Sequence, residues 1–233
     1  MKFEINSIFD MIEYVIITAG GTGLRMKSDT PKQFLPLKGK PILMHSIERF
    51  YNYNNDLIII ISLPEEFIPY WKNLCEKYKF AIMHSVVKGG STRFNSIKNA
   101  LQNLKDPGLV AVHDGVRPLV SVKTIENTFK TARIKGNAVA VQDIVFSIRR
   151  TEGTKNVAVN RSNYKEIQTP QTFESELLKK AYNSEYEESF TDDATVVEKL
   201  GITVNLVKGN PENIKITTKN DLMIAETLID SIF

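Results

Sequence analysis

The chain has 233 residues, of which 42% are hydrophobic and 24% are charged, so it is long enough for a sizeable core and has an ordinary globular composition. Its formal net charge of +3, without a block of like charges, gives no indication of binding to nucleic acid. No apolar run reaches the length of a membrane span, and the single cysteine, Cys75, excludes an intramolecular disulfide and is typical of a protein of the reducing cytoplasm.

Short β-branched runs alternate with amphipathic helical patterns after an N-terminal extension of residues 1–13. Strands are predicted over residues 14–18, 57–62, 80–87, 109–113 and 138–141, with helices near 41–51, 65–78, 94–104 and 122–129. This alternation predicts an α/β fold with a mostly parallel sheet, covered by helices on both faces. Ligands of such sheets bind beyond the carboxyl ends of the strands, so the loops that start at Ala19, Lys88 and Asp114 are expected to form one site.

The alternation stops between about residues 142 and 170, where two β-prone runs, 144–148 and 157–159, flank the turn Thr151–Thr154. This pattern predicts a β-hairpin that projects from the domain as an arm, and its apolar side is expected to pack on a partner. The remaining predicted elements are a helix near 174–183, a helix capped by Thr191 and stopped by Gly201, a strand over 204–207, and a last helix that begins near Thr218. Because no linker interrupts the pattern, residues 1–233 are predicted to form a single domain.

A glycine-rich loop follows the first predicted strand, with the sequence Ala19-Gly20-Gly21-Thr22-Gly23, and Arg25 and Lys32 come after it. Glycines let backbone N–H groups approach an anion closely, and the two cations add fixed positive charge. The combination indicates a site for a nucleotide triphosphate, although the loop matches neither the P-loop nor the full dinucleotide fingerprint. The alternative interpretation is an ordinary tight turn with an exposed arginine and lysine.

Two further segments place charged side chains at the same edge of the predicted sheet. A predicted helix begins at the segment Gly89-Gly90-Ser91-Thr92-Arg93, where Arg93 and the first amides of the helix can contact a base or a phosphate. The alternative interpretation of this segment is an ordinary helix capped by Ser91, without a ligand. In His113-Asp114-Gly115-Val116-Arg117, Asp114 can orient a hydroxyl or a metal and Arg117 can bind a phosphate, unless the two form an internal ion pair. His113 is expected to be a packed strand residue.

Lys215 lies between the apolar residues Ile214 and Ile216 near the C-terminus. An alternating strand would turn Lys215 to the opposite face from these two neighbours. A lysine is a compact point charge that suits a phosphate, so Lys215 is a candidate ligand for one. The alternative interpretation is that Lys215 lies on a solvated edge of the sheet.

Taken in order, these motifs resemble the 2-C-methyl-D-erythritol 4-phosphate cytidylyltransferase family over nearly the whole chain from Tyr14 onwards. The ribitol-5-phosphate cytidylyltransferases share most of the motifs, whereas the segment from Thr191 to Ala194 favours the methylerythritol family. One departure follows Asp143, where the family often has a threonine and a basic residue; here Ile144-Val145-Phe146 follow. The motifs that carry the resemblance are Ala19 to Met26, Pro31-Lys32-Gln33, Gly89-Gly90 with Arg93 and Ser96, His113 to Pro118, Gln168-Thr169-Pro170-Gln171, Thr191-Asp192-Asp193-Ala194 and Asn213 to Thr217.

The resemblance implies a Rossmann-like nucleotidyltransferase that transfers a cytidylyl group from CTP to 2-C-methyl-D-erythritol 4-phosphate. It also implies Mg²⁺ bound mainly through the triphosphate, with no metal ligands assigned to the protein, and a homodimer in which each arm reaches over the partner's site. A ribitol 5-phosphate acceptor, or a catalytically silent nucleotide-binding homologue, is the alternative.

The resemblance implies three sets of site residues. The catalytic residues are Arg25, Lys32 and Lys215. The CTP-binding residues are Ala19, Gly20, Gly21, Thr22, Gly23, Gly90, Ser91, Arg93, Ser96 and Asp114. The residues that bind the sugar phosphate are Asp114, Arg117, Thr169 and Lys215, together with Arg161 from the partner's arm.

Overall fold

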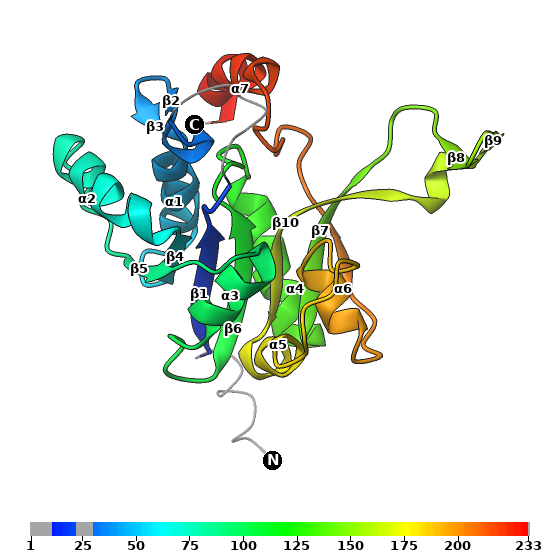
Figure 1. Ribbon diagram of the computed structural model, residues 1–233, viewed down its shortest axis with the longest axis horizontal. Coiled ribbons are helices and arrows are strands. Elements are labelled where there is room, and N and C mark those ends of the chain that lie inside the picture. Colours follow the sequence, from blue (N-terminus) through cyan, green and yellow to red (C-terminus); the bar gives the residue numbers. More distant parts are fainter. Residues whose placement is uncertain (1–10, 22–29, 233) are drawn as a thin grey trace.

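The structure, a computed structural model, describes residues 11–21 and 30–232. A seven-stranded sheet with the strand order β11-β7-β10-β6-β1-β4-β5 lies at its centre (Figure 1). All neighbouring strands of this sheet pair in parallel except β10, which is antiparallel to both β6 and β7. The predicted α/β fold with a mostly parallel sheet is therefore confirmed. The strands of the sheet are β1 (Ile12–Thr18), β4 (Ile58–Leu63), β5 (Ser85–Lys88), β6 (Gly108–Asp114), β7 (Asn137–Asp143), β10 (Lys165–Glu174) and β11 (Leu206–Lys208).

Helices cover both faces of the sheet, as predicted. Strand β1 shows why, because Val15 and Ile17 pack with helices α1, α2 and α4, whereas Tyr14 and Ile16 pack with α3, α5 and α6. Successive side chains of a strand alternate between faces, so a continuous apolar run is buried on both sides. The helices are α1 (Ile42–Tyr53), α2 (Ile68–Lys77), α3 (Arg93–Leu101), α4 (Val122–Lys135), α5 (Ser175–Tyr182), α6 (Asp193–Glu198) and α7 (Lys219–Ile232).

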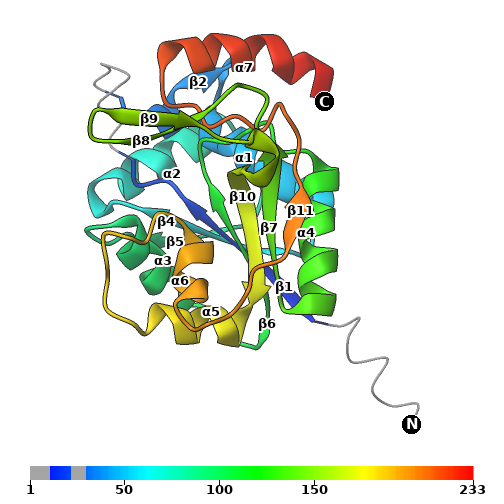
Figure 2. The same cartoon turned by 90° about the vertical axis from the view of Figure 1, so that its right-hand side faces the viewer.

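A smaller apolar cluster holds the C-terminal helix beside the start of α1. Ala225 and Ile229 of α7 pack against Leu37 and Ile216. Leu37 belongs to the short hairpin of β2 (Pro36–Leu37) and β3 (Lys40–Pro41), and Figure 2 shows α7 next to β2 at the top of the molecule. None of the helices in residues 11–21 and 30–232 is long and apolar enough to cross a membrane.

Several element boundaries differ from those expected. The third strand begins at Ser85 and not at residue 80. Helix α3 is capped by Thr92, whose hydroxyl accepts the Asn95 N–H, and not by Ser91. Helix α6 is capped by Asp192, and not by Thr191, because the Asp192 carboxylate accepts the Thr195 N–H at 2.9 Å. In both helices the side chain one residue later than expected accepts a free N–H of the first turn.

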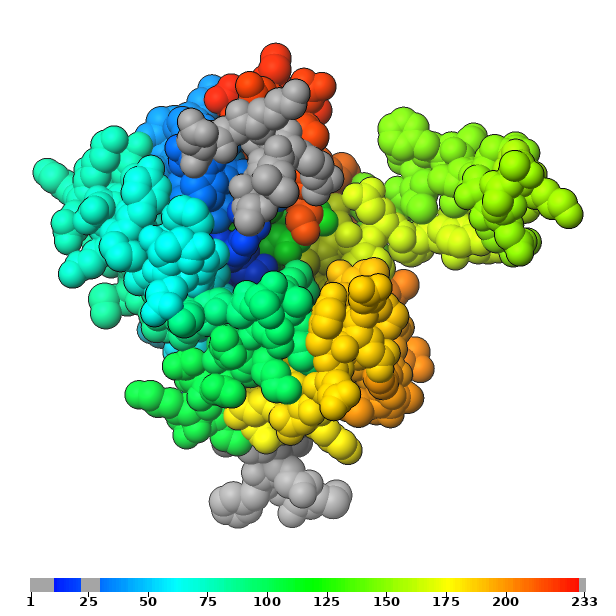
Figure 3. Space-filling view, in the orientation of Figure 1, coloured from blue at the N-terminus to red at the C-terminus, as the bar shows by residue number. Residues whose placement is uncertain are grey.

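The segment from residue 144 to 164 leaves the body of the protein as an arm (Figures 1 and 3). Its hairpin consists of β8 (Arg149–Glu152) and β9 (Lys155–Ala158), so the projecting hairpin is confirmed. The expected strand at 144–148 is wrong, whereas the one at 157–159 overlaps β9 at residues 157–158. Gly153, with a φ of +56°, makes the turn and thereby pairs Glu152 with Lys155. Phe146 is 77% exposed on this arm. Packing of the arm on a partner stays a prediction.

Strand β10 is the main element that the periodicity of the sequence does not reveal. It returns from the arm and enters the sheet between β6 and β7 (Figure 1). Its regular pairing with β7 is interrupted between Ile167 and Gln171. Such irregularities re-aim side chains and are common next to functional sites. Here the interruption contains Gln168 and Thr169, which line a cavity.

Candidate active site

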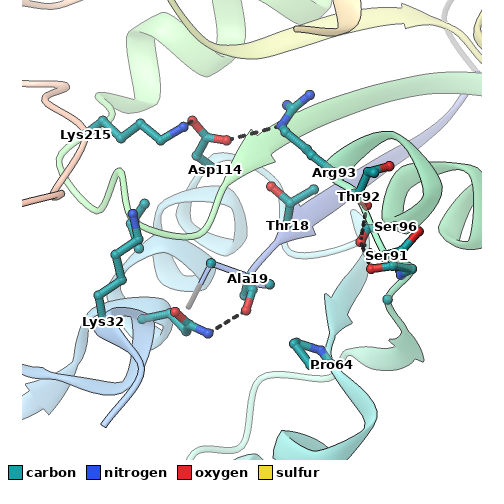
Figure 4. A pocket seen from close by; sticks show the side chains of 16 residues that line it. Thr18, Ala19, Lys32, Pro64, Ser91, Thr92, Arg93, Ser96, Asp114 and Lys215 are labelled. Atoms are coloured by element: carbon teal, nitrogen blue, oxygen red, sulfur yellow. Dashed lines mark hydrogen bonds and ion pairs between the residues drawn. The ribbon is translucent and has the colours of Figure 1, made fainter. Parts of the chain in front are cut away.

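A cavity of about 260 Å³ opens at the carboxyl ends of the parallel strands (Figure 4). The loops after β1, β5 and β6 meet there, as predicted from the alternation of strands and helices. A second cavity of about 230 Å³ is lined partly by residues of β10 and shares Arg93, Asp114 and Lys215 with the first. The first cavity is lined by Thr18, Ala19, Gly20, Gly21, Lys32, Gln33, Pro64, Gly89, Gly90, Ser91, Thr92, Arg93, Ser96, Asp114, Val116 and Lys215.

The loop after β1 is held in place from both sides. The Ala19 N–H donates to the Ser62 carbonyl at 3.0 Å, and the Gln33 amide donates to the Ala19 carbonyl at 2.6 Å. A Cβ at Gly21 would lie 3.1 Å from Cε of Lys32, so the absence of a side chain there lets Lys32 lie against the loop. Gln33 was missed as a site residue, although it directly follows Lys32 in the motif.

Lys32 reaches the cavity from the short helix η3 (Lys32–Phe34), opposite Asp114 in Figure 4. This helix is anchored by Phe34, whose ring stacks on Trp71 with centroids 6.1 Å apart. The aromatic contact fixes the position of a side chain that carries charge into the cavity. Three residues of the predicted loop site, Thr22, Gly23 and Arg25, lie outside the described residues.

The glycine turn before α3 forms the opposite wall of the cavity. The Ser96 hydroxyl accepts the Gly90 N–H at 3.0 Å and donates to the Thr92 carbonyl at 2.9 Å. A Cβ at Gly90 would lie 2.4 Å from Cβ of Asn95, so only glycine allows this close approach of turn and helix. The structure therefore brings Gly90, Ser91 and Ser96 to the same cavity as Ala19, Gly20 and Gly21.

Arg93 lines both cavities, but its terminal nitrogens are paired with Asp193. Its Nη1 and Nη2 lie 3.1 and 2.7 Å from the two carboxylate oxygens, and the Tyr182 hydroxyl donates to the same carboxylate at 2.6 Å. This bidentate pair joins α3 to α6. Asp193, which is fully buried, was missed as a site residue; its place in the segment Thr191–Ala194 was the available signal. A contact of Arg93 with CTP stays a prediction.

Asp114 is surrounded by three cationic side chains, and Figure 4 shows two of them, Lys215 and Arg93. The carboxylate lies 2.9 Å from Nζ of Lys215, 3.4 Å from Nε of Arg117 and 3.6 Å from Nε of Arg93. Burial alone would raise the pKa of Asp114, but the three cations outweigh it and hold that pKa well below its usual range. The internal Asp114–Arg117 ion pair is therefore present, and it forms part of the cavity wall.

Lys215 points towards Asp114, whereas its two neighbours point into the protein, as predicted. The segment 213–217 is not a strand, however. Ile216 N–H donates to the Val116 carbonyl at 2.9 Å, and Ile216 is buried against α7. This contact on the other side of the chain turns Lys215 outwards, where its side chain is 42% exposed.

His113 is a packed strand residue, as expected, and it contacts the second cavity through Thr169. Its Nδ1 lies 3.0 Å from the Thr169 hydroxyl, and its Nε2 lies 3.1 Å from the Arg117 carbonyl. Complete burial lowers the pKa of His113 to about 4. Arg117 is fixed further by Nη1, which donates to the Asn213 carbonyl at 2.6 Å. Asn213 was not predicted as a site residue.

The family model for 2-C-methyl-D-erythritol 4-phosphate cytidylyltransferase matches residues 13–231. The chain belongs to this family. A cytidylyltransferase of that name from Phocaeicola vulgatus is 52% identical over 219 residues, which cover 94% of this chain and 100% of that protein.

Two solved structures support the same assignment for the fold. The 4-diphosphocytidyl-2C-methyl-D-erythritol synthase of Anaerococcus prevotii has a TM-score of 0.82 and 27% identity, covering 97% of this chain and 99% of that one. The 2-C-methyl-D-erythritol 4-phosphate cytidylyltransferase of Thermus thermophilus has a TM-score of 0.77 and 30% identity, covering 94% and 100%. The resemblance inferred from the motifs is thus confirmed, and the chain is a nucleotidyltransferase of this cytidylyltransferase family.

One residue implied by the cytidylyltransferase resemblance lies apart from both cavities. Arg161 belongs to the short helix η5 (Arg161–Asn163) on the arm, where it donates to the carbonyl of Val145. It does not line either cavity. Its contribution to a neighbouring site, across a homodimer, stays a prediction.

Proposed function

We propose that this cytidylyltransferase transfers the cytidylyl group from CTP to 2-C-methyl-D-erythritol 4-phosphate, which yields CDP-methylerythritol and pyrophosphate. The observation that carries the proposal is a pair of adjoining cavities that share Asp114 and Lys215. The first cavity lies between two glycine turns and suits the nucleotide; the second suits the polyol phosphate. The relatives named above favour this acceptor over ribitol 5-phosphate.

The reaction needs positioning and charge more than acid–base chemistry. An oxygen of the acceptor phosphate bonds to the α-phosphorus of CTP as the bond to the bridging oxygen of pyrophosphate breaks. The acceptor phosphate has a second pKa of about 6, so at neutral pH it is mostly a dianion and needs no general base. Catalysis then consists of alignment and of stabilising negative charge in the transition state.

The cationic side chains divide this work between the two cavities. Lys32, beside the β1 loop, is proposed to bind the triphosphate together with Arg25. Lys215, whose Nζ is 2.9 Å from Asp114, stands where the cavities join and is proposed to bring the acceptor phosphate to the α-phosphorus. Arg117 lines the second cavity only, which supports a role towards the acceptor.

Magnesium is proposed to arrive with the triphosphate, where it would neutralise phosphate charge. Within residues 11–21 and 30–232, no group of three or more His, Cys, Asp or Glu side chains is placed to hold a metal ion. Among the described residues, Asp114 is the carboxylate that lines the first cavity, and three cations already surround it. This lining fits an ion held mainly by phosphate oxygens and water, without a protein ligand.

The proposed working unit is a homodimer in the cytoplasm. The arm carries Arg161 and exposed apolar side chains, among them Val145, which is 64% exposed, and Phe146. These features support contact of the arm with a second copy of the chain, in which Arg161 would reach the partner's acceptor cavity. The single cysteine of the sequence supports a reducing compartment.

The proposal is tested by pyrophosphate release from CTP and Mg²⁺ with two acceptors in parallel. We expect clear preference for 2-C-methyl-D-erythritol 4-phosphate over ribitol 5-phosphate. The reverse preference would change the acceptor and leave the nucleotide site intact. Release with neither acceptor would refute the proposal and favour a silent nucleotide-binding protein.

A Lys32→Ala variant tests the proposed charge stabilisation. Removing one preorganised donor to the transition state lowers kcat by about 100-fold or more, so we expect a loss of that size. The urea midpoint should change little. Lys40→Ala is a matched control, since Lys40 pairs with Glu48 at 2.5 Å and does not line the cavity. Near-normal turnover of Lys32→Ala would contradict the catalytic role.

A further inference from the structure

Four residues form a connected hydrogen-bond network at the carboxyl end of β6, beside the irregular middle of β10. The Asp114 N–H donates to the Thr169 hydroxyl at 3.1 Å. The same hydroxyl lies 3.0 Å from Nδ1 of His113, and Nε2 of His113 lies 3.1 Å from the Arg117 carbonyl. These hydrogen bonds link Asp114, Arg117 and Thr169 through the fully buried imidazole of His113. All three linked residues are assigned to the polyol phosphate.

The chemistry of the groups sets the direction of each hydrogen bond. A carbonyl only accepts, so Nε2 of His113 carries the ring hydrogen. The buried ring is neutral, as its lowered pKa indicates, so Nδ1 has no hydrogen and accepts. The Thr169 hydroxyl must then donate its only hydrogen to His113. One lone pair of the hydroxyl accepts from Asp114, and one lone pair remains.

We propose that His113 is a positioning residue that fixes the Thr169 hydroxyl as a hydrogen-bond acceptor, so that Thr169 recognises a hydroxyl group of the polyol and not its phosphate. The inference rests on the proposed function. Thr169 lines the second cavity, and no other residue in the described part of the chain hydrogen-bonds to its hydroxyl. A phosphate dianion has only acceptor oxygens, which a lone pair repels, whereas a polyol hydroxyl can donate to it.

The same cavity supplies a separate place for the phosphate. Three cations, Arg93, Arg117 and Lys215, line it together with Thr169. The terminal nitrogens of Arg93 are held by Asp193, so Arg117 and Lys215 are the cations proposed for the phosphate. One cavity therefore combines cations, which suit a phosphate, with an acceptor-only hydroxyl, which suits a polyol hydroxyl. The ring of His113 also packs edge-on against Phe50, with centroids 4.9 Å apart.

The first test separates the two nitrogens of the ring. In His113→Asn the side-chain oxygen can replace Nδ1 as acceptor for Thr169, whereas in His113→Gln the amide can replace only Nε2 as donor to Arg117. We expect KM for 2-C-methyl-D-erythritol 4-phosphate to rise about tenfold in His113→Gln and less than about threefold in His113→Asn. KM for CTP should stay within about twofold in both. Equal changes in the two variants, or a parallel rise in KM for CTP, would overturn the proposal.

Variants of Thr169 keep the proposal testable if the histidine variants do not fold. Thr169→Val removes the hydroxyl at nearly constant volume and should raise KM for the polyol phosphate about tenfold, whereas Thr169→Ser should restore it. Thr172→Val is the matched control, because the Thr172 hydroxyl lies on the same strand, is buried and has no hydrogen-bond partner in the described residues. An unchanged KM in Thr169→Val would overturn the proposal.

A spectroscopic measurement separates failure of this inference from failure of the proposed function. The ¹⁵N signals of the His113 ring distinguish a bare Nδ1 from a protonated one, and they do not depend on turnover. The chain has three histidines, so loss of one signal pair in His113→Gln assigns the ring. A hydrogen on Nδ1 would refute the inference even in an active enzyme. A bare Nδ1 in an enzyme that does not use the polyol phosphate would refute the proposed function instead.

Discussion

The ion pair between Arg93 and Asp193 offers a sharp test of how this site is held together. We consider Asp193→Asn, which removes one negative charge and preserves the shape of the side chain. In the wild type the carboxylate is fully buried and accepts two charge-assisted hydrogen bonds from Arg93 and one from Tyr182. The asparagine oxygen can still accept from Tyr182, so the variant mainly loses the bidentate pair with Arg93.

The structure allows the size of this loss to be worked out. Removing one partner of a buried ion pair costs about 3–5 kcal/mol, because the other charge is left uncompensated. The Arg93 side chain is 30% exposed and Nε lies 3.6 Å from Asp114, so water and a second carboxylate offset part of the loss. We therefore expect about 3 kcal/mol at the lower end of that range. With a urea m-value of about 3 kcal/mol/M, the midpoint falls by about 1 M.

The assay is urea unfolding followed by circular dichroism, with KM for CTP measured on the same samples. Because α6 is then no longer tied to Arg93, KM for CTP should also rise. Glu126→Gln is the control: its ion pair with Lys123 spans 2.8 Å, but the two side chains are 48% and 72% exposed, so the urea midpoint should not change measurably. A loss below about 1 kcal/mol in Asp193→Asn would refute the reasoning from burial.

Two further predictions follow from named contacts. In Gly90→Ala the added Cβ lies 2.4 Å from Cβ of Asn95, and such overpacking costs about 2 kcal/mol. That cost lowers Tm by about 4–8 °C, and a calorimetric shift below about 1 °C would contradict it. The ring of His84 accepts from Trp71 at 3.1 Å and donates to the Ile82 carbonyl at 2.7 Å, and burial lowers its pKa. The neutral ring of His84 therefore contributes stability above about pH 6.5, and this contribution is lost as the pH falls through the lowered pKa. Fluorescence of the single tryptophan should change with a midpoint below pH 6.5. A midpoint above pH 6.5 would contradict a lowered pKa of His84.

The sequence by itself determined the parallel strands of the sheet and the place of the site. Apolar runs such as residues 14–18 alternate with helical patterns, and this local periodicity is enough to predict parallel strands with helices on both faces. The glycine turns at Gly21 and Gly90 follow strands directly. Their convergence with Asp114 could therefore be predicted from the general geometry of parallel sheets.

The tertiary structure alone decided which partners each charged group has. Arg93 and Asp193 are 100 residues apart in sequence, and no local pattern indicates that α3 and α6 pack together. Likewise, Thr169 meets His113 only because β10 enters the sheet antiparallel beside β6. Periodicity records which residues are buried and not what they are buried against. The hydrogen-bond partners in this site therefore depend on long-range packing, whereas its location depends on local sequence.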